Sequence, residues 1–79
     1  MPVGKIPKMR IDTNKVLELR AASGSVNLDQ FAKQLGLTKP TIREFLNKEV
    51  ASQRIIVALC LLATQVYKRS ITPSHFALS

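Results

Sequence analysis

The sequence contains a single cysteine, Cys60, so it cannot form an internal disulfide framework. A reduced, intracellular setting is then the default, and we expect the protein in the cytoplasm. Acidic residues are also scarce: 5 Asp and Glu stand against 12 Lys and Arg, for a formal net charge of +7. The apolar fraction, 46%, is too high for a disordered basic chain. A compact basic domain remains, with nucleic acid as its first candidate partner and a membrane surface as its second.

No segment is long enough to cross a membrane. The longest uncharged run, residues 55–67, has 13 residues, whereas a spanning helix needs about 20. The first 12 residues contain no apolar core of the kind that a signal peptide requires. We therefore expect residues 55–67 to form a buried helix, and we expect no membrane partner.

The groups that carry enzyme chemistry are few and scattered. The sequence has no Cys/His cluster, no glycine-rich phosphate loop and no Ser/His/Asp set. His75 stands alone near the C-terminus, and Cys60 has apolar neighbours that favour a core position over a nucleophilic role. We expect no enzymatic activity, no metal, no cofactor and no small-molecule ligand.

The charge and the chain-breaking residues divide the sequence into three parts. Residues 1–11 carry three basic residues and no acid, together with two prolines and a glycine, and this predicts a flexible basic arm. An end of the chain without a role is the alternative. Residues 12–69 form the predicted helical domain, and residues 70–79 form a short apolar tail. A chain of 79 residues allows one small domain with a modest core.

Capping residues and apolar spacing predict two helices in the first half of the domain. The first begins after Asp12 or Thr13, either of which can accept from free backbone N–H groups, and ends at Ser23-Gly24. The second begins at Asn27, with Gln30 three residues later in a pattern that resembles a capping box.

Two further helices are predicted by the same signals. Gly36 ends the second helix, and Thr38 can cap a third in which Pro40 occupies the first turn, where proline is tolerated. Ser52 can cap a fourth helix that runs to about Lys68. The expected fold is all-α, with four helices or, if the tail adds one, five.

The segment around Gly36 has the requirements of a helix-turn-helix: a small residue, Ala32, where the helices meet, and a glycine in the turn. Apolar residues occupy the positions that should face inward, namely Phe31, Leu35, Leu37, Ile42 and Phe45. Polar residues occupy the outward positions, namely Gln30, Lys33, Gln34, Lys39, Thr41, Arg43, Glu44 and Asn47. Any small helical bundle with a glycine turn is the alternative.

Residues 30–46, QFAKQLGLTKPTIREFL, resemble the phage repressor and Cro family, the lambda-repressor-like or XRE-type helix-turn-helix regulators. The resemblance covers about 20 residues well and about 55 loosely. It implies a small helical domain that binds double-stranded DNA and serves as a regulator of a phage, plasmid or mobile element. In that family the second helix of the motif enters the major groove and its first residues touch base edges.

Carried over by position, the resemblance implies two sets of contact residues. Base edges would be contacted by Lys39, Pro40, Thr41, Arg43, Glu44 and Asn47. Phosphates would be contacted by Lys33, Thr38 and Lys48 and, from the arm, by Lys5, Lys8 and Arg10. Pro40 departs from the family pattern, because it cannot donate a hydrogen bond; it would touch a thymine methyl group or fix the helix start. For each charged residue the alternative is an ordinary solvated side chain.

The fourth predicted helix is apolar almost all round, so it needs cover on more than one side. Little chain remains to cover it within a monomer. We therefore predict a homodimer, with an interface made by Val57, Leu61, Phe76 and Leu78. The alternative is that the tail folds back over the helix within one chain.

The sequence thus predicts a dimeric, sequence-specific DNA-binding regulator, a repressor at a palindromic operator. A second hypothesis is a protein-interaction module, such as an antitoxin, that docks a partner through the fourth helix. A third is a recombination accessory protein that bends DNA.

Overall fold

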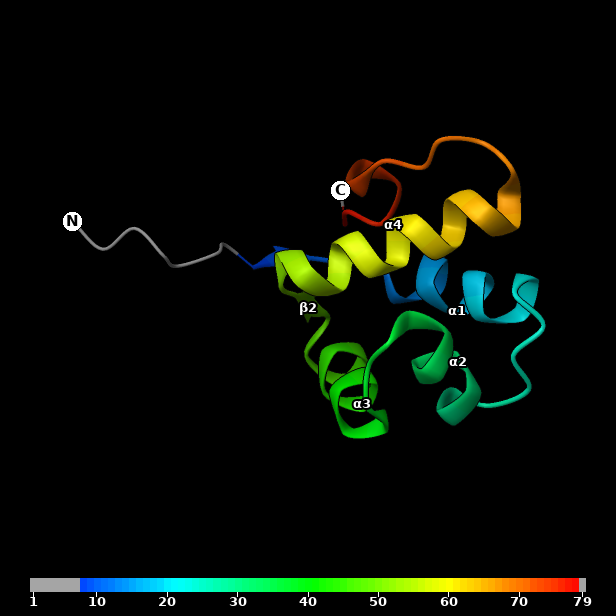
Figure 1. Ribbon diagram of the computed structural model, residues 1–79. Coiled ribbons are helices and arrows are strands. Elements are labelled where there is room, and N and C mark those ends of the chain that lie inside the picture. Colours follow the sequence, from blue (N-terminus) through cyan, green and yellow to red (C-terminus); the bar gives the residue numbers. More distant parts are fainter. Residues whose placement is uncertain (1–7, 79) are drawn as a thin grey trace.

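The computed structural model describes residues 8–78, which are mostly helical with one short two-stranded sheet (Figure 1). The elements in chain order are β1 (Met9–Arg10), α1 (Thr13–Ala22), α2 (Leu28–Leu35), α3 (Lys39–Lys48), β2 (Val50–Ala51), α4 (Gln53–Tyr67) and the 3-10 turn η1 (Pro73–His75). The predicted number and order of the four α-helices are confirmed. The strands were not predicted.

Two helices begin at the capping residues that the sequence indicated. The Asp12 carboxylate accepts from the Asn14 N–H at 3.0 Å, and the Asn27 side chain accepts from the Gln30 N–H at 2.9 Å. Gln30 does not complete the expected capping box, because its side-chain oxygen accepts instead from the Val26 N–H at 3.2 Å. Ser52 and Thr38 occupy N-cap positions without a capping hydrogen bond from the side chain.

Left-handed residues end three of the helices. Gly36, with φ 72°, ends α2 at the predicted place, and glycine adopts this conformation at no steric cost. Glu49 and Lys68 end α3 and α4 with φ 58° and 57°. Glu49 alone separates α3 from β2, whereas residues 68–72 connect α4 to η1.

The core lies between all four helices and both ends of the described chain. Of the five residues predicted to face inward around the turn, Phe31, Leu35, Ile42 and Phe45 are buried and Leu37 is half-buried. The α4 helix contributes Ile56, Leu59, Leu62 and Ala63. In Figure 1, α4 lies between the C-terminal segment on one side and α1, α2 and α3 on the other. No helix in residues 8–78 has the length and apolar character that crossing a membrane demands.

The predicted flexible arm is wrong for residues 9–11. Met9 and Arg10 pair antiparallel with Ala51 and Val50, and Ile11 is fully buried, with its N–H donating to the Glu49 carbonyl at 3.0 Å. Hydrogen bonds to the segment after α3 therefore hold this part of the chain. Residues 1–7, which include Lys5, lie outside the described residues.

The C-terminal segment belongs to the core rather than to a free tail. Phe76 is 0% exposed, and its carbonyl accepts from the Asp12 N–H at 2.8 Å. The Leu78 N–H donates to the Arg10 carbonyl at 3.1 Å, and Ile11 forms a bridge with Ala77. The assignment of Phe76 to a dimer interface is therefore wrong. The C-terminal segment folds back over α4 within one chain, which was the alternative prediction.

Candidate nucleic-acid interface

The turn between α2 and α3 brings the two helices together through small and apolar side chains. Ala32 is 1% exposed, and its carbonyl accepts from the Leu37 N–H at 2.8 Å, just after Gly36 reverses the chain. Ile42 and Phe45 are buried on the inner side of α3. This packing fixes α3 by one side and leaves its opposite side exposed.

A network around Ser25 fixes α2 against α1. Ser25 is buried, and its hydroxyl accepts from the Gln34 amide at 2.6 Å and lies 3.0 Å from the Ser23 hydroxyl. Arg20 donates to the Ser25 carbonyl at 3.0 Å. Gln34 was predicted to face outward, and no role was predicted for Ser25. Ser25 could not be identified from the sequence, because neither helical periodicity nor a capping pattern indicates a hydrogen bond to Gln34, nine residues later.

The exposed side of α3 carries most of the predicted base-contacting residues. Five of the six are exposed, namely Lys39, Pro40, Arg43, Glu44 and Asn47. Thr41 is half-buried at the edge of this face, and its hydroxyl lies 2.8 Å from the hydroxyl of Thr38. The side chain of Thr38 is thereby directed to Thr41 and not to the free N–H groups of the helix.

Some charged side chains of α2 and α3 form ion pairs, and others do not. Glu44 lies 3.6 Å from the Lys48 amine, and on α2 Asp29 lies 4.0 Å from the Lys33 amine. Both pairs join exposed side chains, so each is weak. Within residues 8–78, Lys39 and Arg43 belong to no ion pair, so their full donor capacity faces solvent.

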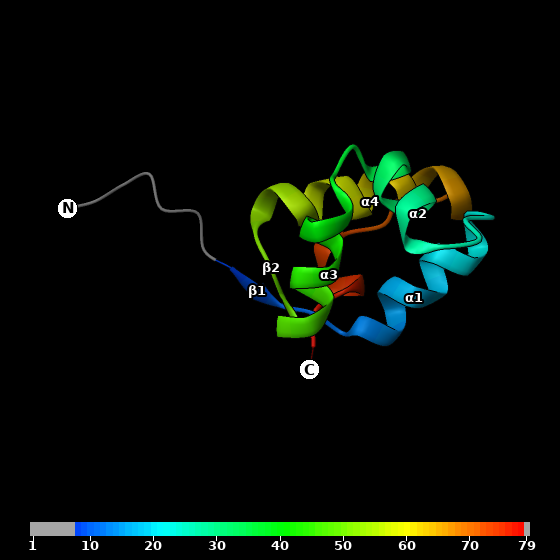
Figure 2. The same ribbon diagram turned by 90° about the horizontal axis from the view of Figure 1, so that it is seen from below.

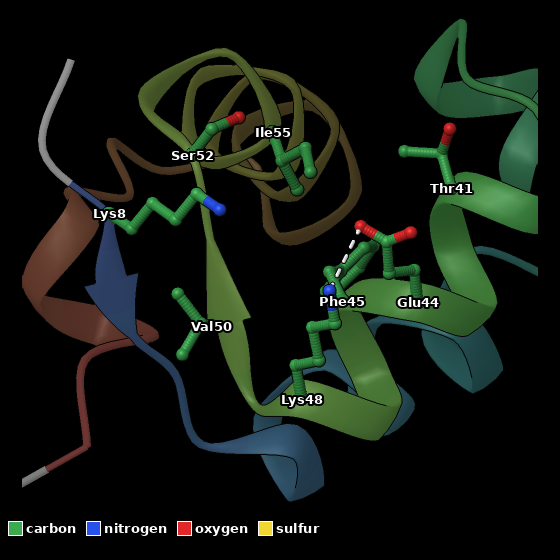
Figure 3. A pocket seen from close by; sticks show the side chains of 8 residues that line it. All are labelled: Lys8, Thr41, Glu44, Phe45, Lys48, Val50, Ser52 and Ile55. Atoms are coloured by element: carbon green, nitrogen blue, oxygen red, sulfur yellow. Dashed lines mark ion pairs between the residues drawn. The ribbon is translucent and has the colours of Figure 1, made fainter. Parts of the chain in front are cut away.

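A hollow of about 140 Å³ opens between α3, β2 and the start of α4; we call it the notch. In Figure 3, the Lys8 amine points into it from the chain just before β1, and Thr41, Glu44 and Lys48 reach it from α3. Ser52 and Ile55 border it on the α4 side. In Figure 2, β1 and β2 lie beside the C-terminal end of α3, which is how Lys8 reaches this place.

A second hollow, of about 350 Å³, adjoins the notch at the start of α4. It shares Thr41, Ser52 and Ile55 with the notch and adds Arg54, together with the residues of the turn, Gly36, Leu37 and Thr38. Neither Arg54 nor Ser52 was predicted as a contact residue. The predicted phosphate contacts Arg10 and Lys33 are exposed but line neither hollow.

Comparison with known proteins leaves the family open. No family model, curated protein or solved structure matches the chain. The function must therefore be argued from the residues themselves.

The remaining polar and reactive groups do not gather into a second site. In the described range 8–78, no three His, Cys, Asp or Glu side chains lie close enough to hold a metal ion. Burial raises the pKa of the Cys60 thiol, so the thiol is a poor nucleophile. His75 contacts Phe76 edge to face, with ring centroids 4.8 Å apart, and its Nε2 is buried without a hydrogen-bond partner in this range.

The outer side of α4 carries two exposed apolar side chains. Val57 and Leu61, four residues apart on one face, are 48% and 63% exposed, and Leu78 is 41% exposed. Of the four predicted interface residues, these three remain available for contact with another molecule.

Proposed function

We propose that the chain is a sequence-specific DNA-binding regulator, a repressor, in which α2 and α3 act as a helix-turn-helix and α3 enters the major groove. The observation that carries the proposal is the outer face of α3. Among residues 8–78, it combines two cations that belong to no ion pair, Lys39 and Arg43, with Asn47 on a helix whose opposite side packs into the core. The net charge of +7 supports attraction to a polyanion.

The chemistry of this face suits base edges in the major groove. Lys39 and Arg43 can donate to guanine O6 and N7, and Asn47 can pair with adenine N6 and N7. Pro40, near the start of the helix, offers an apolar contact to a thymine methyl group. Glu44 can accept from cytosine N4, although Lys48 competes for it.

We further propose that two copies bind a palindromic operator, because paired motifs can read half-sites about one helical turn apart. The surface that would join them is Val57, Leu61 and Leu78. The same exposed apolar side chains favour the second candidate function, a module that docks a different protein through α4.

The test is substitution on α3. Lys39→Ala and Arg43→Ala should each weaken binding to a selected site by about 1–3 kcal/mol and relax the base preference at the contacted position. Arg69→Ala, an exposed cation beyond α4, is the control and should leave base preference unchanged. Selection of sites from random duplexes, followed by titration of each variant, measures both quantities.

Two outcomes would count against the proposal. If both α3 variants keep the wild-type base preference, α3 is not the reading helix. If the selection enriches no sequence at all, the protein does not discriminate between sites, and docking to a protein becomes the better explanation.

A further inference from the structure

The notch between α3 and α4 has a composition that the base-reading face does not explain. Two amines, from Lys8 and Lys48, and two hydroxyls, from Thr41 and Ser52, line one hollow of about 140 Å³ (Figure 3). Such a set, with several donors lining one hollow, suits an oxyanion.

We propose that the notch holds one phosphate of the DNA backbone, on Lys8, Lys48, Ser52 and Thr41. This inference rests on the proposed DNA-binding function and adds where one strand is anchored beside α3. It also changes the role of Lys8, which enters the site as part of a paired segment and not as part of a loose arm. The pairing of Met9 with Ala51 brings Lys8 opposite Ser52 in the next register position.

The hydroxyls are free to serve a ligand. Ser52 stands at the N-cap of α4 but forms no capping hydrogen bond, so its hydroxyl keeps its donor. Thr41 shares one hydrogen bond with Thr38 and keeps further capacity, because a hydroxyl has one donor and two acceptor sites.

Glu44 is the single acid in the notch, and its position predicts competition. Its carboxylate lies 3.6 Å from the Lys48 amine, on the same lining. A phosphate in the notch would replace Glu44 as the ion-pair partner of Lys48, and the Glu44 carboxylate would repel it. Glu44 therefore weakens phosphate binding and limits how tightly the chain holds DNA of any sequence.

The surroundings favour a phosphodiester chain over a free phosphate ion. The adjoining hollow shares Thr41, Ser52 and Ile55 with the notch and carries a third cation, Arg54. Cations thus follow one another from one hollow to the next, which suits successive phosphates of a strand.

The first experiment removes the notch donors in the full chain and measures binding to a mixed-sequence duplex over a range of salt concentrations. Lys8→Ala should lower the affinity and reduce the slope of log K against log salt by about 0.9, the share of one phosphate contact. Ser52→Ala should lower the affinity about tenfold or more with little change of slope, because the lost hydrogen bond joins a neutral donor to a charged phosphate oxygen. Arg69→Ala, a cation outside both hollows, is the matched control.

The second experiment uses Glu44→Gln, because the two possible roles of Glu44 predict opposite changes in the affinity for DNA. If Glu44 opposes a phosphate in the notch, the variant binds the mixed-sequence duplex more tightly than wild type, most strongly at low salt. If Glu44 only reads cytosine, the variant loses affinity on the selected site and gains nothing on the mixed sequence. Thermal unfolding of each variant checks that the fold is kept.

A third measurement separates the sources of phosphate. Amide shifts of Lys8 and Ser52 should move on addition of duplex and stay in place in inorganic phosphate at matched ionic strength. If inorganic phosphate moves them and duplex does not, the notch is a free-anion site and the DNA assignment is overturned. If the chain binds duplex but Lys8→Ala matches Arg69→Ala, the notch inference alone fails. A wild-type chain that binds no duplex overturns both this inference and the proposed function.

Discussion

Cys60 shows at the scale of a single residue how packing decides chemistry. The thiol is half-buried on α4, and desolvation raises its pKa because burial disfavours the thiolate. Since the thiolate is the reactive form, iodoacetamide at pH 8 should modify the native protein severalfold more slowly than a free cysteine. Mass spectrometry over a time course measures the rate, and unfolding in guanidinium should restore the ordinary one. A native rate equal to the unfolded rate would show that the thiol is not protected.

The two apolar residues Phe76 and Leu78 mark the limit of residue-level prediction. Both were assigned to a dimer interface, yet Phe76 is 0% exposed and Leu78 is 41% exposed. Phe76 is buried in the core, whereas Leu78 is not part of it, although backbone hydrogen bonds join both residues to Asp12 and Arg10, more than sixty residues earlier. Local sequence therefore shows that both residues are apolar but not which of them is buried.

At the scale of elements, the helices were predictable because their signals are local. Asn27 binds an N–H three residues away, and Gly36 ends α2 through its own φ. The strands β1 and β2 depend on pairing between segments about forty residues apart, and no short pattern indicates that pairing. The exposed face of α3 followed from helical periodicity, whereas the notch, which needs β1 beside β2, did not.

The C-terminal segment should prove to be a structural element. Phe76→Ala should lower the free energy of unfolding by about 3–5 kcal/mol, the usual cost of removing a buried aromatic ring. Domains of this size have about 5–15 kcal/mol in total, so the variant should be close to unfolding at physiological temperature.

Thermal denaturation followed by circular dichroism provides the measurement for this segment. Leu78→Ala is the control, because a side chain that remains 41% exposed loses less on truncation. If the two variants lower the midpoint equally, Phe76 does not have the core role that its burial indicates.

At the scale of the whole molecule, size no longer requires a dimer. The apolar sides of α4 were expected to remain unburied within a monomer. Ile71 and Phe76 of the same chain are instead buried with α4 in one core. The large apolar side chains that remain exposed on α4 are Val57 and Leu61, whereas a stable interface buries about 800 Å² on each partner. Two chains of +7 also repel each other. A homodimer would therefore be weak in free solution and favoured on DNA, where phosphates neutralise the charge.

The free chain should be monomeric and should assemble in pairs only on DNA. Sedimentation should find the free chain mainly monomeric at micromolar concentration, and two copies should bind cooperatively to a duplex with two half-sites. Leu61→Ser with Val57→Ser should abolish the cooperativity and leave binding to a single half-site unchanged, because neither side chain lines the notch or the adjoining hollow. Val26→Ser removes an even more exposed apolar group from the loop before α2 and should change neither quantity. Loss of single-site binding in the α4 variants would place Val57 and Leu61 in the DNA interface itself. Non-cooperative binding by the wild type would remove the second copy from the proposal and leave this face to a different protein.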